Sequence, residues 1–213
     1  MYKNSKKLGR VLSLGVLAVL AAPLAQAAQV AILDVHLLGG WTGVAVEGTG
    51  NERDVDASKS MSYGIGAGVE IPLAESFGLV TGLDYLHRKF QVGFDAARLE
   101  RTIPTIIVPV MARAWIGDVF YVQGGVYGSK GVGSITDSAV SGNDTLIGFD
   151  HDNRRAIDFG AIAGAGVNVA MFGKTGLYVQ GQYLHGFTDS AGATIYEERV
   201  RDLLVSTGIR IEL

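Results

Sequence analysis

Hydrophobic and polar residues alternate with a period of two along most of the chain, and this alternation predicts β-strands. The last segment, 203–213, has an apolar or β-branched residue at every second position. The residues between them are polar, charged or small, except Leu204. Because a strand with an unpaired edge is prone to aggregation, we expect 203–213 to pair with the first strand and close the sheet into a barrel.

Eight segments carry this alternation, and the lengths of the connections between them alternate as well. The predicted strands are 30–46, 61–73, 77–90, 102–116, 119–131, 156–171, 176–187 and 203–213. Long polar loops are expected over 48–60, 91–101, 132–155 and 188–201, with three short turns between them. Long loops at one end and tight turns at the other are typical of outer-membrane barrels. The sequence therefore predicts an all-β fold, an eight-stranded antiparallel up-and-down transmembrane β-barrel.

Two prolines lie in the most apolar segment, 102–116. Proline has no backbone N–H to donate to a neighbouring strand. We therefore expect a bulge or locally irregular pairing near Pro104 and Pro109.

The first 27 residues have the three regions of a secretory signal peptide. A basic stretch, an apolar stretch and a small-residue cleavage site follow one another: Lys3, Lys6, Lys7 and Arg10, then 11–20, then Ala25-Gln26-Ala27. The apolar stretch is too short for a transmembrane helix. We expect 1–27 to be the signal peptide and 28–213 the barrel domain, exported to the outer membrane of a Gram-negative bacterium.

The composition of the chain argues against some classes of binding partner and against a water-exposed outer face. Without the signal peptide, 14 of the 18 Lys and Arg residues remain against 21 Asp and Glu residues, a net charge of −7 that argues against nucleic acid. Only four lysines remain, whereas a soluble β protein normally covers its outer face with Lys and Glu. The chain has no Cys, so we expect neither disulfides nor a Cys-linked lipid anchor.

The alternation alone does not tell which face is apolar, because a secreted lipocalin-like barrel has the same period with its apolar face inward. The polar positions here are rich in Gly and carry few charges of both signs, which suits the narrow interior of an eight-stranded barrel. Seven charged residues are therefore expected to pair in the lumen: Asp34, Glu70, Asp84, Arg88, Arg113, Asp158 and Arg210. We expect them to fill and lock the barrel; a small pore or a ligand-carrying barrel is the alternative.

Aromatic residues lie near the ends of the predicted strands, where a membrane barrel has its two aromatic girdles. Phe77, Trp115, Phe120 and Phe172 lie beside the short turns, and Trp41 lies nearer the loop end. We predict that these five residues are interfacial aromatics. Trp115 shares its parity with Arg113, so an inward orientation is the alternative for this residue.

Few residues have the spacing of a catalytic or metal site. His185, Thr188 and Asp189 lie near the loop end of a strand, where a lipid-modifying barrel would place its Ser, His and acid, but no Ser follows His185 at a spacing typical of such a site. The acidic run 150–153 lacks the spacing of a calcium loop, and the four histidines lack zinc spacing. We expect no enzyme activity, catalytic residue, metal or cofactor; a lipid-modifying enzyme is the weaker alternative.

The whole chain after residue 27 resembles the small eight-stranded outer-membrane barrels, the OmpA- and OmpX-like proteins, in its strand number and connection lengths. The segment Ile103-Pro104-Thr105-Ile106-Ile107 also resembles the Ile-Pro-apolar strand of the PorT-like barrels. The resemblance implies a monomer in outer-membrane lipid, inserted by the barrel-assembly machinery. We expect a structural or interaction role, with an external ligand or surface partner at the loops, above all at 132–155, the longest loop.

Overall fold

The computed structural model describes residues 31–48, 55–94, 97–141, 144–152, 157–188 and 196–213. The predicted signal peptide lies outside these residues. No helix in the described segments is long and apolar enough to cross a membrane.

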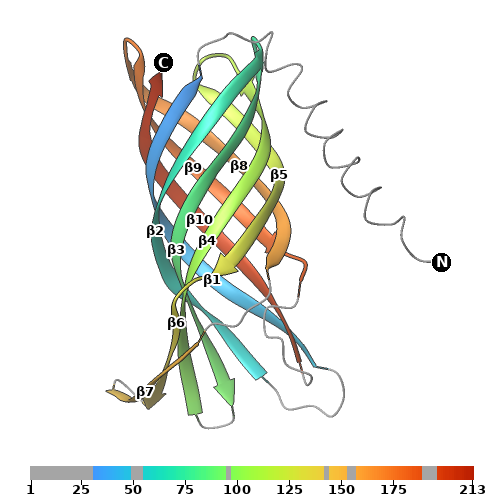
Figure 1. Ribbon diagram of the computed structural model, residues 1–213, viewed down its shortest axis with the longest axis vertical. Helices are drawn as coiled ribbons and strands as arrows, with labels where there is room; N and C mark the ends of the chain where they lie inside the picture. The colour runs from blue at the N-terminus through green and yellow to red at the C-terminus, as the bar shows by residue number, and fades with distance from the viewer. Residues whose placement is uncertain (1–30, 49–54, 95–96, 142–143, 153–156, 189–195) are drawn as a thin grey trace, which may run out of the picture. The chain divides into compact units, whose positions relative to one another are not determined.

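Ten antiparallel strands make up the described chain, and eight of them close a ring (Figure 1). They are β1 (Ile32–Gly48), β2 (Val55–Ala74), β3 (Phe77–Phe94), β4 (Ala97–Ile116), β5 (Phe120–Gly131), β6 (Ser134–Ser141), β7 (Asp144–Asp152), β8 (Asp158–Phe172), β9 (Thr175–Gly186) and β10 (Tyr196–Glu212). The order around the ring is β1-β2-β3-β4-β5-β8-β9-β10, and β10 pairs with β1. The predicted eight-stranded antiparallel barrel is confirmed.

The closing pair joins the first and last strands over their full length. Ile32 lies opposite Glu212, Trp41 opposite Leu203 and Gly48 opposite Tyr196. This is the pairing expected from the alternation in 203–213. β1 also pairs with β2 over residues 32–42, and β10 pairs with β9 over residues 201–211, so within these ranges neither strand has a free edge.

Apolar side chains cover the outside of the ring, and polar side chains line much of its inside. Leu37, Phe120 and Ile209 are exposed on the outer face, whereas Glu70 and Arg113 are buried in the interior. A soluble lipocalin-like barrel has the opposite arrangement. An apolar outer face on a closed barrel suits lipid as the surrounding solvent.

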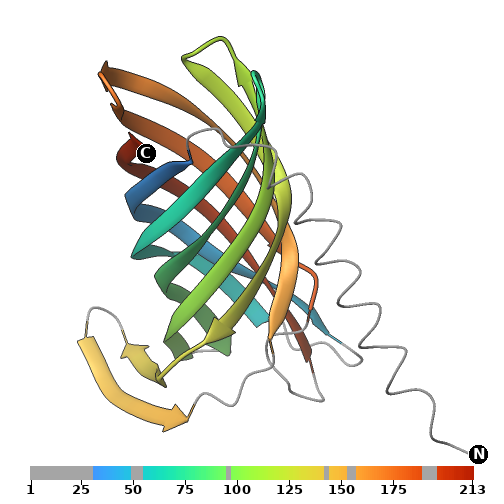
Figure 2. The same cartoon turned by 45° about the horizontal axis from the view of Figure 1, so that its top comes forward.

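At the end of the barrel where the sequence predicted long loops, more residues belong to strands than expected. β3 continues to Phe94 and β4 begins at Ala97, so the expected loop over 91–101 is a short connection. β10 begins at Tyr196 rather than at 203. The expected loop over 132–155 contains the β6–β7 hairpin, which continues the sheet from β4 beyond the ring (Figures 1 and 2). These polar segments have no apolar face that would predict a strand. They form strands because their backbones pair with a neighbouring strand.

β4 has no bulge at either of its two prolines. β4 keeps one register against β3 and one against β5 across Pro104 and Pro109. The expected bulge is wrong, because a register shift needs an extra residue in one strand and the loss of one donor adds none. Locally irregular pairing does occur at Pro109, since the β3–β4 pairing passes from Thr81 opposite Val110 to Asp84 opposite Ile107 and omits the residues between them. The shifts within the ring occur in β2 and β8, at Lys59/Tyr63, Pro72/Ala74 and Asn168/Ala170.

Three tight turns join the strands at the end of the ring opposite the hairpin (Figure 1). Gly117 and Gly173 have φ angles of 65° and 62° in the β4–β5 and β8–β9 turns, a conformation that glycine adopts without a Cβ clash. We call this the turn end of the barrel and the opposite one the loop end.

Candidate functional site

The turn end of the lumen holds a buried ion pair between Glu70 of β2 and Arg113 of β4. The Trp115 indole Nε1–H donates to the other Glu70 oxygen at 2.8 Å. Arg113 also donates from Nε and Nη2 to Gln123 Oε1, at 3.0 and 2.7 Å. Both charged groups therefore have several hydrogen-bond partners, which offsets the cost of burying them.

Next to this pair, His36 of β1 bridges two carboxylates. Its Nδ1 atom is 2.7 Å from Asp34 Oδ1, and its Nε2 atom is 3.0 Å from Asp84 Oδ1. Two carboxylate acceptors require an N–H on both ring nitrogens, so the geometry fits a protonated imidazolium. A Cβ on Gly66 would lie 2.1 Å from Asp84 Oδ1 and 2.3 Å from His36 Nε2, so the bridge needs a glycine at this position.

Arg210 of β10 lies among aromatic rings. Its guanidinium carbon is 4.1, 4.4 and 5.3 Å from the ring centres of Tyr178, Tyr121 and Trp115. Its Nη1 donates to Asn168 Oδ1 at 3.0 Å. Cation–π contacts of a desolvated guanidinium contribute about 2 kcal/mol. The expected ion pair of Arg210 with an acid is not formed within the described residues, and the aromatic rings replace it.

The loop end of the lumen holds a second buried ion pair, between Arg88 of β3 and Asp202 of β10. Arg88 Nη2 and Nε donate to Asp202 Oδ2 at 2.7 and 3.1 Å, and Thr42 of β1 donates to the other oxygen at 2.6 Å. Ser129 of β5 accepts from Arg88 at 3.3 Å and donates to Asp158 of β8 at 3.4 Å. Five strands of the ring are thereby joined through side chains around one buried charge pair.

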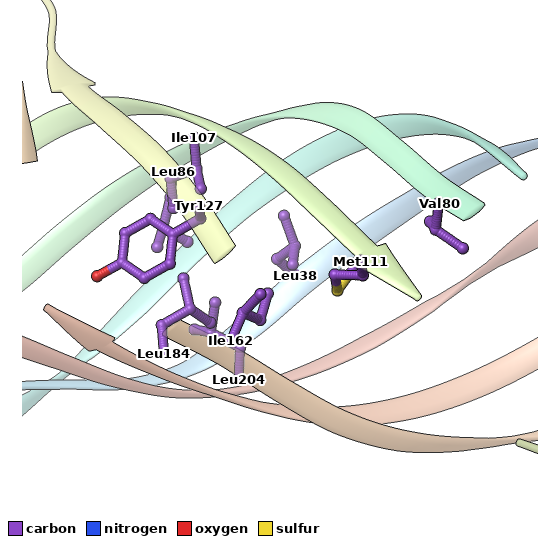
Figure 3. Packing of buried hydrophobic residues seen from close by; sticks show 9 residues of the cluster. All are labelled: Leu38, Val80, Leu86, Ile107, Met111, Tyr127, Ile162, Leu184 and Leu204. Atoms are coloured by element: carbon purple, nitrogen blue, oxygen red, sulfur yellow. The ribbon is translucent and has the colours of Figure 1, made fainter. Parts of the chain in front are cut away.

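An apolar layer, which we call the plug, separates the two ionic layers. Its cluster of nine side chains lies inside the ring in Figure 3: Leu38, Val80, Leu86, Ile107, Met111, Tyr127, Ile162, Leu184 and Leu204. Val80 stands apart from the others, opposite Glu70 in the β2–β3 pairing. Leu86, Leu184 and Leu204 are each at most 1 % exposed. Because Leu86 lies between Asp84 and Arg88 along β3, the plug closes the lumen between the His36 bridge and the Arg88–Asp202 pair.

A second apolar cluster lies at the loop end. It contains Val44, Phe90, Ile103 and Ile135, all buried. Ile135 belongs to β6, so the hairpin beyond the ring contributes a side chain to this cluster. The lumen therefore has two apolar layers and two ionic layers, stacked along the strands.

All seven charges predicted for the lumen lie inside it, with exposed fractions between 2 % and 7 %. His36 was placed on the inward polar face from its position in the alternation but was not counted in the charge network, and Asp202, which also lies at a polar position, was left out. The sequence predicted a polar lumen filled by these charges and did not reveal the apolar layer. Its sequence signal is an apolar residue at an inward position in mid-strand, such as Leu38 in β1 or Leu204 in β10.

Four of the five predicted interfacial aromatics lie on the outer face. Trp41, Phe77, Phe120 and Phe172 are between 52 % and 68 % exposed. Trp115 instead points into the lumen, where it contacts Glu70 and Arg210, so its assignment to the outer girdle is wrong. The physical reason is its parity on β4, which places its indole N–H within reach of a buried carboxylate.

A cavity of about 510 Å³ opens at the turn end of the lumen. Trp115 and Arg210 line it on the inside, and Glu75, Asp118 and Lys174 line it nearer the turns. A much smaller space of about 30 Å³ lies deeper, beside the His36 bridge and Gln123, and has room for about one water molecule.

The residues weighed as a catalytic group have separate partners. The Tyr183 hydroxyl is 3.3 Å from His185 Nδ1, whereas Thr188 donates to Asp158 and accepts from the Phe159 N–H at 3.1 Å. Asp189 lies outside the described residues, as does the last residue of the acidic run 150–153. No group of three His, Cys, Asp or Glu side chains within the described segments is placed to hold a metal ion.

A closed antiparallel ring with an apolar outer face and a filled, charged lumen defines a membrane β-barrel. Residues 25–192 match the family described as outer membrane protein beta-barrel domain, and the chain belongs to that family. It is a small outer-membrane β-barrel protein. No curated protein is similar enough in sequence to count as a relative. The monomeric state and insertion by the barrel-assembly machinery stay predictions.

Several solved structures of small outer-membrane proteins are similar to this chain. OprG from Pseudomonas aeruginosa is 12 % identical with a TM-score of 0.45, over 84 % of this chain and 95 % of that one. Neisserial surface protein A is 10 % identical with a TM-score of 0.42, over 85 % and 97 %. Ail of Yersinia pestis, solved with the heparin analogue sucrose octasulfate, is 12 % identical with a TM-score of 0.41, over 84 % and 99 %.

Proposed function

We propose that this protein is a non-conducting barrel with a structural or interaction role, which anchors the β6–β7 hairpin and the neighbouring loops at the outer surface of the membrane. The observation that supports the proposal is the filled lumen. Leu86, Leu184 and Leu204 occupy its centre between two buried ion pairs. A dry apolar constriction opposes ion passage, because nothing in it replaces the hydration shell of the ion.

The attachment of the hairpin supports the second half of the proposal. β6 pairs with β4 from Arg98 opposite Val140 to Thr102 opposite Thr136. Ile135 adds a buried side-chain contact in the loop-end apolar cluster. The hairpin therefore projects beyond the ring from a base held by both backbone and side chain. Such a base suits a segment that contacts an external partner, since binding then orders fewer residues.

Recordings from planar lipid bilayers test whether the plug is a barrier. Wild-type protein should give no stepwise current, whereas Leu86→Ala/Leu184→Ala, which removes two side chains of the plug, should give small current steps. Leu83→Ala/Leu177→Ala, a matched pair on the outer face, should stay silent. Different gel migration of unheated and boiled samples verifies that each variant folds. Steady current through the wild-type barrel would contradict the proposal.

Thiol labelling of intact cells tests which end faces outward. Because the chain has no Cys, one introduced thiol is the only reactive one. Ser138→Cys in β6 should react with a membrane-impermeant maleimide, and Asp118→Cys in the β4–β5 turn should react only after the envelope is opened. The opposite pattern would place the hairpin in the periplasm and would end its role at the cell surface.

We also infer that the barrel has no enzyme activity. The support is the separation of the candidate groups, since Thr188 is bonded to Asp158 and His185 contacts Tyr183. Mass spectra of lipid A from cells with and without the protein should be identical. A new lipid A species that depends on the protein would refute this inference.

A further inference from the structure

Basic side chains lie in a row on the outer face of the neighbouring strands β9, β10, β1 and β2 at the loop end, with a glycine at the β1 position. Arg201 of β10 lies opposite His185 of β9 on one side and opposite Gly43 of β1 on the other. Lys59 of β2 covers Gly43, since a Cβ on that glycine would lie 3.0 Å from Lys59 Cγ. We call His185, Arg201 and Lys59 the basic row.

An aromatic and apolar row lies next to the basic row, one outward position closer to the turn end. It consists of Tyr183, Leu203, Trp41 and Met61 on the same four strands, in register with one another. These side chains are between 42 % and 66 % exposed. The order of an apolar face, then aromatic side chains, then basic side chains matches the passage of a membrane from hydrocarbon through its interface to charged headgroups.

The charge of the basic row is open to a partner. On the loop side of Trp41, the outward positions of these four strands carry no carboxylate among the residues whose side chains the structure describes. Lys59 and Arg201 are exposed there. Lys89, another outward lysine at this end, differs because it lies 3.7 Å from Glu100.

We propose that the basic row binds the phosphate of a lipid headgroup in the leaflet that surrounds the loop end. Arg201 presents a planar set of N–H donors that matches phosphate oxygens, and Lys59 and His185 flank it. Trp41 and Tyr183 pack against the apolar part of the same lipid. A free phosphate ion has no apolar part, so contact with the aromatic row distinguishes a lipid from an ion. The site lies outside the lumen and is independent of whether the barrel conducts.

Native mass spectrometry of the purified full-length barrel, released from detergent, tests this site. The probes are bis-phosphorylated lipid A, the same lipid after phosphatase treatment, and phosphatidylcholine. Wild-type protein should retain lipid A about tenfold more than the dephosphorylated form, as expected for loss of charge-assisted hydrogen bonds. Lys59→Gln/Arg201→Gln should lose this preference. Lys130→Gln should keep it, because Lys130 is an exposed outward lysine on β5, across the ring from β1.

Two results would overturn the proposal. One is equal retention of lipid A by Lys59→Gln/Arg201→Gln and by Lys130→Gln. The other is equal retention of lipid A and its dephosphorylated form by wild-type protein, a comparison that needs no variant to fold. Trp41→Ala should weaken lipid A retention and leave the effect of added inorganic phosphate unchanged. If inorganic phosphate alone removed all bound lipid A at the lipid's own concentration, the row would be a free-anion site and not a lipid site.

Discussion

Replacing Arg113 with methionine removes a guanidinium that holds two buried groups of the lumen. Glu70 would keep the Trp115 N–H at 2.8 Å and lose its charge partner. Gln123 Oε1 would lose donors at 3.0 and 2.7 Å. Breaking a buried pair from one side costs about 3–5 kcal/mol, because the remaining charge is uncompensated. We expect Arg113→Met to lower the free energy of unfolding by that amount.

A second substitution separates the charge from the packing. Glu70→Gln combined with Arg113→Met removes the uncompensated carboxylate, so the double variant should recover at least about 2 kcal/mol relative to Arg113→Met alone. The assay is guanidinium chloride unfolding in phosphatidylcholine vesicles, followed by tryptophan fluorescence and by gel migration of unheated samples. Lys130→Met is the control for loss of an exposed cation and should change the unfolding free energy by less than about 0.5 kcal/mol.

Two outcomes would refute the reasoning about this ion pair. The first is an equal loss of unfolding free energy in Arg113→Met and Lys130→Met. The second is a double variant no more stable than Arg113→Met. Either result would mean that the Glu70 carboxylate is solvated in the barrel and that the lumen is wetter than its burial indicates.

Two further predictions use matched positions on the two faces of the barrel. Leu204→Ala should lower the free energy of unfolding by about 2–5 kcal/mol because it leaves a cavity in the plug. Leu203→Ala should lower it less, since lipid replaces the lost contacts on the outer face. Equal losses of unfolding free energy in the same assay would contradict the assignment of faces. Gly166→Ala places a Cβ 2.2 Å from the buried Tyr121 ring and should cost about 1–3 kcal/mol, whereas Gly39→Ala meets nothing within 4 Å and should be tolerated. Equal unfolding midpoints for these two variants would show that the Tyr121 ring moves freely.

The number of membrane strands and the direction of their faces could be predicted because each face has one uniform environment. Leu203 and Ile209 alternate with Asp202 and Arg210, and this local pattern survives without knowledge of any neighbour. The extra strand at the loop end could not be predicted in this way. β6 and β7 are polar segments whose strand form depends on pairing with β4 and with each other.

The candidate site was predictable as a set of residues and not as a set of contacts. Parity assigned Glu70, Asp84 and Arg113 to the lumen from the sequence. It did not tell that Glu70 pairs with Arg113 or that Arg210 stacks on Tyr178. The Trp115 error has the same origin, since proximity to a turn and parity on the strand predicted different faces and only the Glu70 contact decided between them.

By itself, the sequence divided most strand residues between two faces, because a period of two is a local property of a strand. The Gly-rich, sparsely charged composition of the polar set then assigned that face to the lumen. Only the tertiary structure decided the partners. Arg88 and Asp202 are 114 residues apart, and His36 and Asp84 are 48 apart. The register and tilt of the eight strands determine where each inward side chain lies along the barrel axis. Once the ring is closed, inward side chains from different strands therefore meet in ionic and apolar layers.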